Sequence, residues 1–435
     1  MADDVISEEL IIGEDFVIGT EAAQPDPDVT VPSPVVTYKF TDLFTFATIA
    51  ELPVNNPTFS LAVNGAGPWQ ATLQTEDEGV RETNWRDATS PWLAALWIDI
   101  DGTLVYGGPV TARKHQQSTG ILTISGADFA TYLSQRVQAR DYEAFVDPEG
   151  HEWAVEEQGA PVPAIAYYLL AEALEKQYSI PITVIRDEQK IDPAEGYPGE
   201  GFRITFSAPV TQQQTLLSML TQLQQLGYQV GVDYACDVQY VAGVPTVAIT
   251  LSYPRRGEAG AFPPVIELSA STDMEYSEDG TQMGNRVIEQ TGATSGTEDV
   301  SKEWLPGMAE DGYPLLEKVV SHAALSPTPA SEKVLEAYAN GDLAIYAYPL
   351  LAPVIPLPMF GTPSIFDLAP VGDDVILRIP KGEGDLPANY PRFPEGLDYR
   401  FRCVRLDCAI PDEGLPTMTA TLNIPPGTVP PLPPG

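Results

Sequence analysis

Short apolar segments separated by turn signals dominate the chain, and the clearest of them lie between residues 92 and 136. An apolar run at 96–100 ends at Asp101-Gly102, a dipeptide typical of two-residue hairpin turns. A returning strand is expected at 104–106, and Gly107-Gly108-Pro109 is expected to break it. The pattern predicts a hairpin within a meander of short antiparallel strands.

The flanking segments continue this pattern. Alternating or apolar runs predict further strands at 58–63, 69–75, 110–113 and 121–125. A short helix is expected from residue 127, since Phe129, Tyr132 and Leu133 recur at helical spacing. Together these elements predict a first β domain at 36–140.

The pattern changes after residue 141. An amphipathic helix is expected at 163–177, and a second helix begins at Thr211, a residue suited to the N-cap, and ends at Gly227. The apolar face of the second helix consists of leucines, namely Leu216, Leu217, Leu220, Leu223 and Leu226. Strands are expected around these helices at 182–185, 202–206 and 228–234. This order predicts an α/β domain at 141–235.

The rest of the chain returns to strands. A connecting region at 236–342 is expected to contain strands at 246–253, 265–269 and 285–291 and a helix at 330–339. Strands at 375–379, 399–406 and 418–424 predict a second β domain at 343–425. We therefore expect an α+β multidomain chain, in which two small β-barrel-like domains flank an α/β middle.

Both ends of the chain have an unusual composition. Residues 1–35 form an acidic, proline-rich arm, and residues 426–435 form a proline-rich tail. Neither segment has enough apolar residues to bury a core of its own. We expect both to become ordered only by lying on neighbouring subunits.

Charge narrows the classes of partner. The net charge of −38 comes from 61 acidic and 23 basic residues, so free binding to a nucleic-acid backbone is not expected. No stretch approaches the roughly twenty apolar residues of a membrane helix, so no membrane insertion is predicted. The first residues lack the basic segment of a signal peptide, which indicates synthesis in a cytoplasm.

Candidate chemistry is sparse. The cysteines, Cys236, Cys403 and Cys408, show no C-x-x-C spacing, which argues against a disulfide framework or a zinc site. The histidines, His115, His151 and His322, are scattered along the chain. The carboxylate pairs Glu156-Glu157 and Glu310-Asp311 are sequence neighbours and would point to opposite faces of a strand. We predict no catalytic residues, no metal ligands and no cofactor.

One motif nevertheless suggests an enzyme. Asp99-x-Asp101-Gly102-Thr103 after an apolar strand resembles the first motif of the haloacid-dehalogenase-type, magnesium-dependent phosphatases, in which the first aspartate is the nucleophile and the second the acid/base. That fold needs a crossover after the motif strand, usually helical, whereas more strand is expected here. Asp373-Asp374 would be the late acidic motif, although it has the pattern of a turn before a strand. The alternative interpretation of Asp99 and Asp101 is structural, with Asp101 in a hairpin turn.

Aromatic residues leave a third possibility open. Several tryptophans would suit a carbohydrate- or receptor-binding tail module by stacking on sugars, namely Trp69, Trp85, Trp92, Trp97 and Trp153. Aromatic residues in strands are more often part of the core.

An ordered set of motifs carries a family resemblance. The set consists of Glu51-Leu52-Pro53, Phe59-Ser60, Gly65-Ala66-Gly67, the hairpin at 101–110, the segment 122–133 with Arg136, the segment 211–217, Gly284-Asn285-Arg286-Val287, Gly372-Asp373-Asp374-Val375 and Arg402-Cys403-Val404. In this order they resemble the minor tail proteins of long-tailed, siphovirus-type phages that infect actinobacteria, which are similar to phage baseplate hub proteins. The resemblance spans about residues 38–425 and leaves both ends uncovered.

The resemblance implies a structural virion protein rather than an enzyme. It implies a ring-shaped hub at the tail tip, built as a trimer, that links the tail tube to receptor-binding and tip proteins during host cell attachment. The implied neighbours are distal tail and tube proteins, the tape measure and other minor tail proteins. DNA would be met only in transit. From the net charge of −38 we further hypothesise that the lumen is net acidic, which would keep DNA from its wall.

Overall fold

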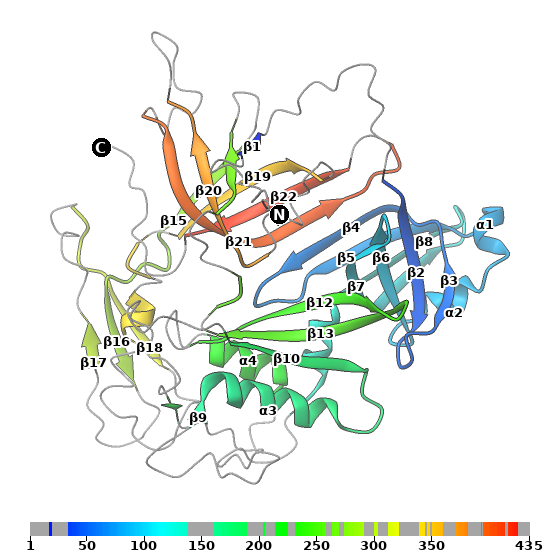
Figure 1. Ribbon diagram of the computed structural model, residues 1–435, viewed down its shortest axis with the longest axis horizontal. Coiled ribbons are helices and arrows are strands. Elements are labelled where there is room, and N and C mark those ends of the chain that lie inside the picture. Colours follow the sequence, from blue (N-terminus) through cyan, green and yellow to red (C-terminus); the bar gives the residue numbers. More distant parts are fainter. Residues whose placement is uncertain are drawn as a thin grey trace, which may run out of the picture.

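The computed structural model describes residues 17–19, 34–137, 160–188, 203–204, 214–224, 231–253, 255–257, 263–268, 274–290, 300–302, 312–321, 339–343, 346–348, 350–359, 371–381, 393, 395–413 and 416–424. The protein is mostly β, and a 14-stranded sheet is the largest element among these residues (Figure 1). The helix expected at 330–339, except for its last residue, and the proline-rich tail lie outside the described residues.

Strands from both ends of the chain form the large sheet. The N-terminal half contributes β1 (Val17–Gly19), β2 (Val36–Asp42), β3 (Thr48–Glu51), β4 (Asn55–Ala62), β5 (Pro68–Gln74), β6 (Ala94–Ile100), β7 (Thr103–Gln116) and β8 (Ile121–Ala127). The C-terminal half contributes β14 (Val265–Glu267), β15 (Glu275–Asp279), β19 (Leu350–Pro358), β20 (Asp374–Ile379), β21 (Leu397–Ala409) and β22 (Thr417–Asn423). The expected strands of both β regions are therefore present.

The two β regions are continuous with each other. Strand β21 pairs antiparallel with β4, from Arg405 opposite Ala62 to Ala409 opposite Thr58. The main path through the sheet is β1-β14-β20-β21-β4-β5-β8-β7-β6-β2-β3, and β22, β19 and β15 extend from the other edge of β21. The described strands close no barrel. The two expected barrel-like domains are thus parts of one sheet, because β21 is long enough to pair with strands of both regions.

The hairpin at Asp101-Gly102 is confirmed. Strands β6 and β7 pair antiparallel up to Ile100 opposite Thr103, which leaves a two-residue loop. Asp101 has φ 51° and Gly102 has φ 85°, and positive φ at both loop residues is the geometry that Asp-Gly favours.

The strand break expected at Gly107-Gly108-Pro109 is wrong. Strand β7 runs unbroken through these residues and changes partner there, from β6 to β8. A Cβ on Gly107 would lie 2.4 Å from the Trp97 ring, and one on Gly108 would lie 2.1 Å from the Ala127 carbonyl oxygen. The glycines therefore permit close packing across the strand instead of ending it.

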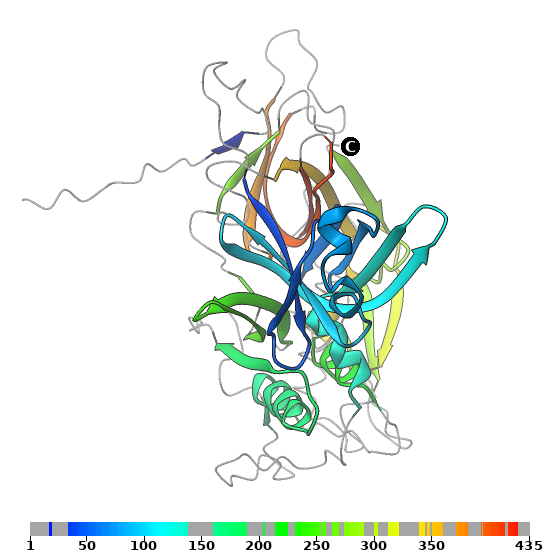
Figure 2. The same cartoon turned by 90° about the vertical axis from the view of Figure 1, so that its right-hand side faces the viewer.

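The middle of the chain forms a smaller layer beneath the large sheet (Figure 1). Its three-stranded sheet has the order β10-β13-β12, with β10 (Ile182–Glu188), β12 (Asp233–Val241) and β13 (Val244–Tyr253). Helices α3 (Val162–Leu174) and α4 (Leu216–Gln224) lie on the far side of this sheet, and both views place them there (Figure 2). The first predicted helix is confirmed, whereas the described second helix begins at Leu216 and the proposed cap Thr211 lies outside the described residues.

The remaining elements are short. They are α1 (Glu78–Arg81), α2 (Trp85–Ala88), the 3₁₀ helix η1 (Phe129–Gln135), β9 (Ala160–Pro161), β11 (Arg203–Ile204), β16 (Arg286–Gln290), β17 (Val300–Lys302) and β18 (Glu317–Ser321). Strands β9 and β11 pair with each other, and β17, β16 and β18 form a separate sheet.

Two apolar cores hold these layers. The first lies between the N-terminal β region and the middle layer, and includes Trp97, Phe129, Leu220 and Tyr234. The second lies within the large sheet and contains residues from both β regions, such as Phe59 and Leu406. Burial of these side chains is the main source of stability for both layers.

Part of the N-terminal arm belongs to the large sheet of its own chain. Strand β1 pairs in parallel with β14, with Val17 opposite Val265. This differs from the expectation that the whole arm orders only on neighbouring subunits, because a short apolar segment has added to a free strand edge. Within the described part of the chain, no helix combines the length and apolar character needed to cross a membrane.

Candidate functional site

Eight strands of the large sheet form an unbroken antiparallel row, β7-β8-β5-β4-β21-β22-β19-β15. One face of this row packs on the second core through residues such as Trp69 and Met418. The cross-strand register places small polar residues side by side on the opposite face, including Thr419, Asp407, Ser60 and others of β5 and β8. We call this opposite face the polar face.

A groove of about 560 Å³ lies on the polar face. Its lining includes Thr58, Gln70, Ser125 and Thr417, which are small or uncharged. The charged lining residues are Arg405 and Asp407, which bind each other: Arg405 Nε donates to Asp407 Oδ1 at 2.8 Å and to Oδ2 at 2.9 Å. This part of the surface is therefore close to neutral in a chain whose net charge is −38.

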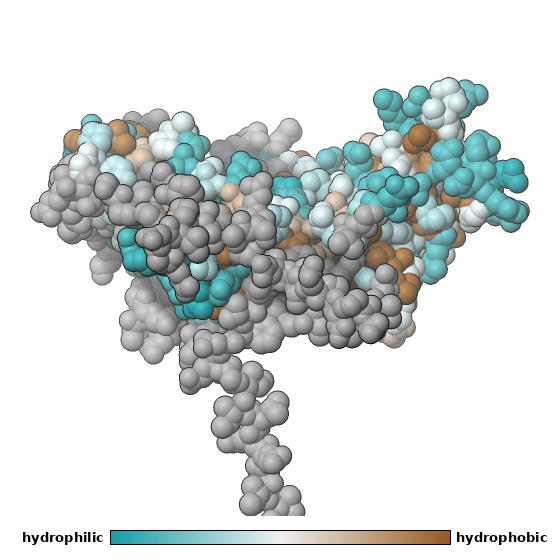
Figure 3. Space-filling view, turned by 90° about the horizontal axis from the view of Figure 1, so that it is seen from above, coloured by the Kyte–Doolittle hydropathy of each residue, from teal (hydrophilic) through white to brown (hydrophobic). Residues whose placement is uncertain are grey.

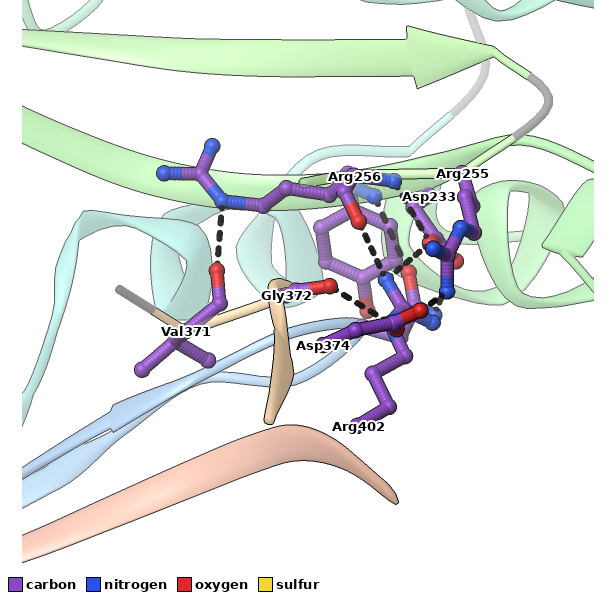
Figure 4. A network of polar contacts seen from close by, with 9 residues as sticks. Asp233, Arg255, Arg256, Val371, Gly372, Asp374 and Arg402 are labelled. Carbon is purple, nitrogen blue, oxygen red and sulfur yellow. Dashed lines mark hydrogen bonds and ion pairs between the residues drawn. The ribbon is translucent and has the colours of Figure 1, made fainter. Parts of the chain in front are cut away.

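A buried polar network joins the middle layer to the C-terminal β region (Figure 4). Arg402 of β21 donates through Nη2 to Asp233 Oδ2 of β12 at 2.5 Å, and through Nε to the Gly372 carbonyl at 2.9 Å. Arg255 Nη1 donates to Asp374 Oδ1 of β20 at 2.8 Å. Side chains in both ion pairs are at most 10% exposed, so each charge depends on its partner.

Arg256 extends this network to the surface. Its two terminal nitrogens bind both oxygens of Asp237, at 2.5 and 2.8 Å, and its Nε donates to the Val371 carbonyl at 3.0 Å. The backbone beside it passes very close to the segment before β20: a Cβ on Gly257, where φ is 83°, would lie 2.3 Å from the Gly372 carbonyl carbon. Glycine at 257 thus allows the two layers to meet.

The turn between β4 and β5 is held between the layers. Asn64 N donates to the Tyr234 carbonyl oxygen at 2.8 Å, and Asn64 Oδ1 accepts from Tyr234 N at 2.9 Å. Asn64 Nδ2 donates to Asp233 Oδ1 at 2.6 Å. On the other side of the turn, Gly67 N donates to Asp128 Oδ2 at 2.8 Å. Sequence analysis included Gly65-Ala66-Gly67 in the motif set but did not predict that this turn connects the layers.

Asp128 is a carboxyl with a strongly shifted pKa near the junction, the place where the middle layer meets the large sheet. It is buried in the wall of a cleft of about 160 Å³ that Cys236, Asp237 and Arg256 also line. Burial raises the pKa of Asp128 to about 7, although hydrogen bonds from the Gly67 and Ala130 amides oppose the shift. A carboxyl with such a pKa changes charge near neutral pH, so the junction contains a titratable group.

The structure gives Asp99 and Asp101 structural contacts. Asp99 is buried at the end of β6; its Oδ1 accepts from Gly102 N at 2.7 Å and its Oδ2 accepts from the Tyr240 hydroxyl at 2.7 Å. Lys39 Nζ in turn donates to the Tyr240 hydroxyl at 2.9 Å, which ties the β12–β13 hairpin to β2. Asp101 Oδ1 accepts from Val35 N at 2.8 Å. Strand β6 lies between antiparallel neighbours, unlike the parallel strand that the phosphatase motif requires, so this alternative is not favoured.

The other candidates fall into two groups. Asp374, proposed as part of a late acidic motif, begins β20 and binds Arg255, whereas Glu156-Glu157, Glu310-Asp311, His151, His322 and Trp153 lie outside the described residues. Trp69 and Trp97 are buried in the cores, and Trp85 and Trp92 are half-buried. Within the described ranges, no three His, Cys, Asp or Glu side chains gather in a way that could hold a metal ion.

Sequence analysis missed the arginines of the junction. One signal was present: Arg255-Arg256-Gly257 follows an apolar strand in a chain with 23 basic residues in total. Two adjacent arginines before a glycine, in so acidic a chain, indicate buried or bidentate ion pairs. Their carboxylate partners are distant in sequence and carry no comparable signal.

Two solved structures of tail proteins have a similar fold. The tail protein from Neisseria meningitidis MC58 matches with a TM-score of 0.56 and 13% sequence identity, covering 90% of this chain and 97% of that one. The 43 kDa tail protein of prophage MuSo2 from Shewanella oneidensis matches with a TM-score of 0.55 and 14% identity, covering 90% of this chain and 99% of that one. No family model and no curated protein matches the sequence. At this level of identity the similarity shows a shared fold.

Proposed function

We propose that the protein is a structural component of a phage tail, a ring-shaped hub at the tail tip made of three copies of the chain. The observation that carries this proposal is the fold, which two tail proteins share over nearly their whole lengths. The family resemblance of the sequence motifs supports the same conclusion. In this role the ring links the tail tube to receptor-binding and tip proteins.

The large sheet supports the ring arrangement. The family resemblance implies a hexameric tail tube above the ring, and three chains match six tube subunits when each chain presents two similar β regions side by side. Here the two β regions share the pairing of β4 with β21 and a single apolar core, so they lie side by side within one chain. We also propose that the chain is divided as the sequence pattern predicts, with boundaries after residues 35, 140, 235, 342 and 425.

DNA passes through such a ring in transit, and the polar face suits a wall along which it moves. A phosphate backbone is held chiefly by Lys and Arg, and the arginine of the groove is already bound to Asp407. We expected an acidic lumen from composition. If the groove on the polar face lines the passage, that part of the wall is close to neutral, and DNA is neither held nor strongly repelled there.

The mass and shape of the assembled particle test the proposal. We expect purified full-length protein to form a trimer by native mass spectrometry, and electron microscopy to show a ring with both β regions of each chain around the passage. A particle that stays monomeric over the accessible concentration range, or a ring built from one β region per chain, would refute it. Tight DNA binding at moderate salt would refute the proposed passage.

A further inference from the structure

The eight-strand row ends on two different strands. At one end lies the second half of β7, residues 111–116, which pairs with β8 on one side. At the other end lies β15, which pairs with β19 on one side. No described strand pairs with the second edge of either segment. Such edges offer a row of backbone donors and acceptors to another chain.

Both terminal segments are open to solvent. Residues 112–116 are exposed, and in Figure 2 the hairpin formed by β7 and β8 projects beyond α1 and α2. Every residue of β15 except the half-buried Tyr276 is exposed. Figure 3 shows that the end of the molecule carrying α1 and α2 is largely hydrophilic on the face in view.

The two edges carry opposite charges. The β7 segment contains Arg113 and Lys114; Arg113 Nη1 donates to the Arg86 carbonyl oxygen of the same chain at 2.7 Å, so the exposed Lys114 supplies the positive charge of this edge. Strand β15 contains Glu275, Glu278 and Asp279. Opposite charges facing each other across a strand pair stabilise it, whereas two copies of the acidic edge would repel each other. A basic edge and an acidic edge therefore suit a contact between different ends of two identical chains.

Strand direction is also compatible. Adjacent strands of the row are antiparallel throughout, and the row has eight strands, so β7 and β15 run in opposite directions. A rotation about an axis along the strands keeps these directions, so β15 of one copy would meet β7 of the next as an antiparallel pair. Such a head-to-tail contact uses two different surfaces and generates a closed ring when the rotation closes.

We propose that residues 111–116 of one copy pair antiparallel with β15 of a second copy, which extends the eight-strand row from chain to chain. The contact joins the basic edge to the acidic edge and leaves the polar face continuous across the joint. This inference rests on the proposed ring, and it adds which strands make the subunit contact.

Charge exchange tests the contact. Lys114→Glu and Glu275→Lys each place like charges across the joint, so each variant should weaken association about tenfold per contact. The double variant restores opposite charges and should recover most of the wild-type association. Glu175→Lys, an exposed position just after α3, makes the same charge change far from both edges and should assemble like the wild type. Analytical ultracentrifugation of the full chain over a concentration series measures these differences.

Crosslinking locates the contact independently. A carbodiimide joins a lysine amine to a carboxylate that touches it, and we expect a peptide containing Lys114 linked to one containing residues 275–279, in trimers but not in monomers. If the wild type is a ring while both single variants assemble normally and this crosslink is absent, the strand contact is wrong and the proposed function stands. A wild type that never associates would overturn both. Single variants that weaken the ring without rescue in the double variant would also overturn the pairing of these two edges.

Discussion

The middle layer is attached to the two β regions by contacts of different kinds. Toward the N-terminal region it packs through an apolar core, where Trp97 and Phe129 meet residues of α3, α4 and β12. Toward the C-terminal region it is joined by charged groups, chiefly Asp233 with Arg402 and Arg255 with Asp374.

The two kinds of contact have different consequences, because one mainly stabilises the molecule and the other mainly fixes the orientation of its parts. Apolar burial is non-directional and stabilises whatever packs well, whereas a buried arginine is satisfied at one distance and one angle. We infer that the first contact holds the layers together and that the second fixes how the C-terminal region is set against the middle. In the proposed ring, this orientation would decide whether the two β regions of a chain lie at the same height along the ring axis.

Loss of the Trp97 side chain should lower the stability most, because it removes part of the apolar core between the N-terminal β region and the middle layer. The side chain is fully buried, and its ring lies 5.1 Å from that of Phe46 and 5.0 Å from that of Phe129. Trp97→Ala should lower the free energy of unfolding by about 3–5 kcal/mol, measured by denaturant titration. The half-buried Trp85 gives the control, and an equal loss from Trp85→Ala would contradict this ranking.

The pH dependence of the free energy of unfolding tests the titration of Asp128, which lies near the junction of the layers. Asp128 has a pKa of about 7 when folded, against 3.8 for an ordinary aspartate, so folding takes up a proton between these values. The free energy of unfolding should therefore fall as pH rises through this window, by up to about 4 kcal/mol, and stay low above it. Asp128→Asn removes the titration, so the difference between the two proteins should change from pH 4 to 8. A constant difference would show that Asp128 does not titrate in this range.

Substitutions in the ion pairs of the middle layer should lower the free energy of unfolding by less than the loss of Trp97. Asp233→Asn keeps the shape but removes the charge that accepts from Arg402 and from the Arg256 amide, and should cost about 1.5–3 kcal/mol. Asp237→Asn also removes a partner of Arg256, but that carboxylate is 40% exposed and should cost under about 1 kcal/mol. Equal losses from the two variants would remove the distinction between buried and exposed pairs.

The smallest effect is expected at Asp101. Asn-Gly suits the same turn as Asp-Gly, and the amide oxygen can still accept from Val35 N, so Asp101→Asn should change stability by less than about 0.5 kcal/mol. A magnesium-dependent phosphatase assay on the wild type and on Asp99→Asn completes this test. Activity that disappears in a folded variant would refute the structural role of these aspartates.

Sequence pattern predicted the local elements well. The Asp101-Gly102 turn, the strands on either side of it and the first helix of the middle follow from residue types within a few positions of each other. The error at Gly107-Gly108-Pro109 came from the same local view, because the reason for the glycines is the Trp97 ring on the neighbouring strand. Most of the candidate site could not be predicted from local sequence pattern, because partners such as Asp233 and Arg402 are separated by 169 residues.

The sequence by itself determined many of the strands, such as those on either side of Asp101-Gly102, and that the chain is strongly acidic, whereas β15 and β19 were not predicted. The tertiary structure alone decided that β4 pairs with β21, across a separation of some 345 residues, and that two expected barrels are one sheet. The physical reason is that all alternating strands offer the same backbone donors and acceptors. Their pairing is selected by the packing of whole faces and by a few buried charges, and those terms exist only once distant segments have met.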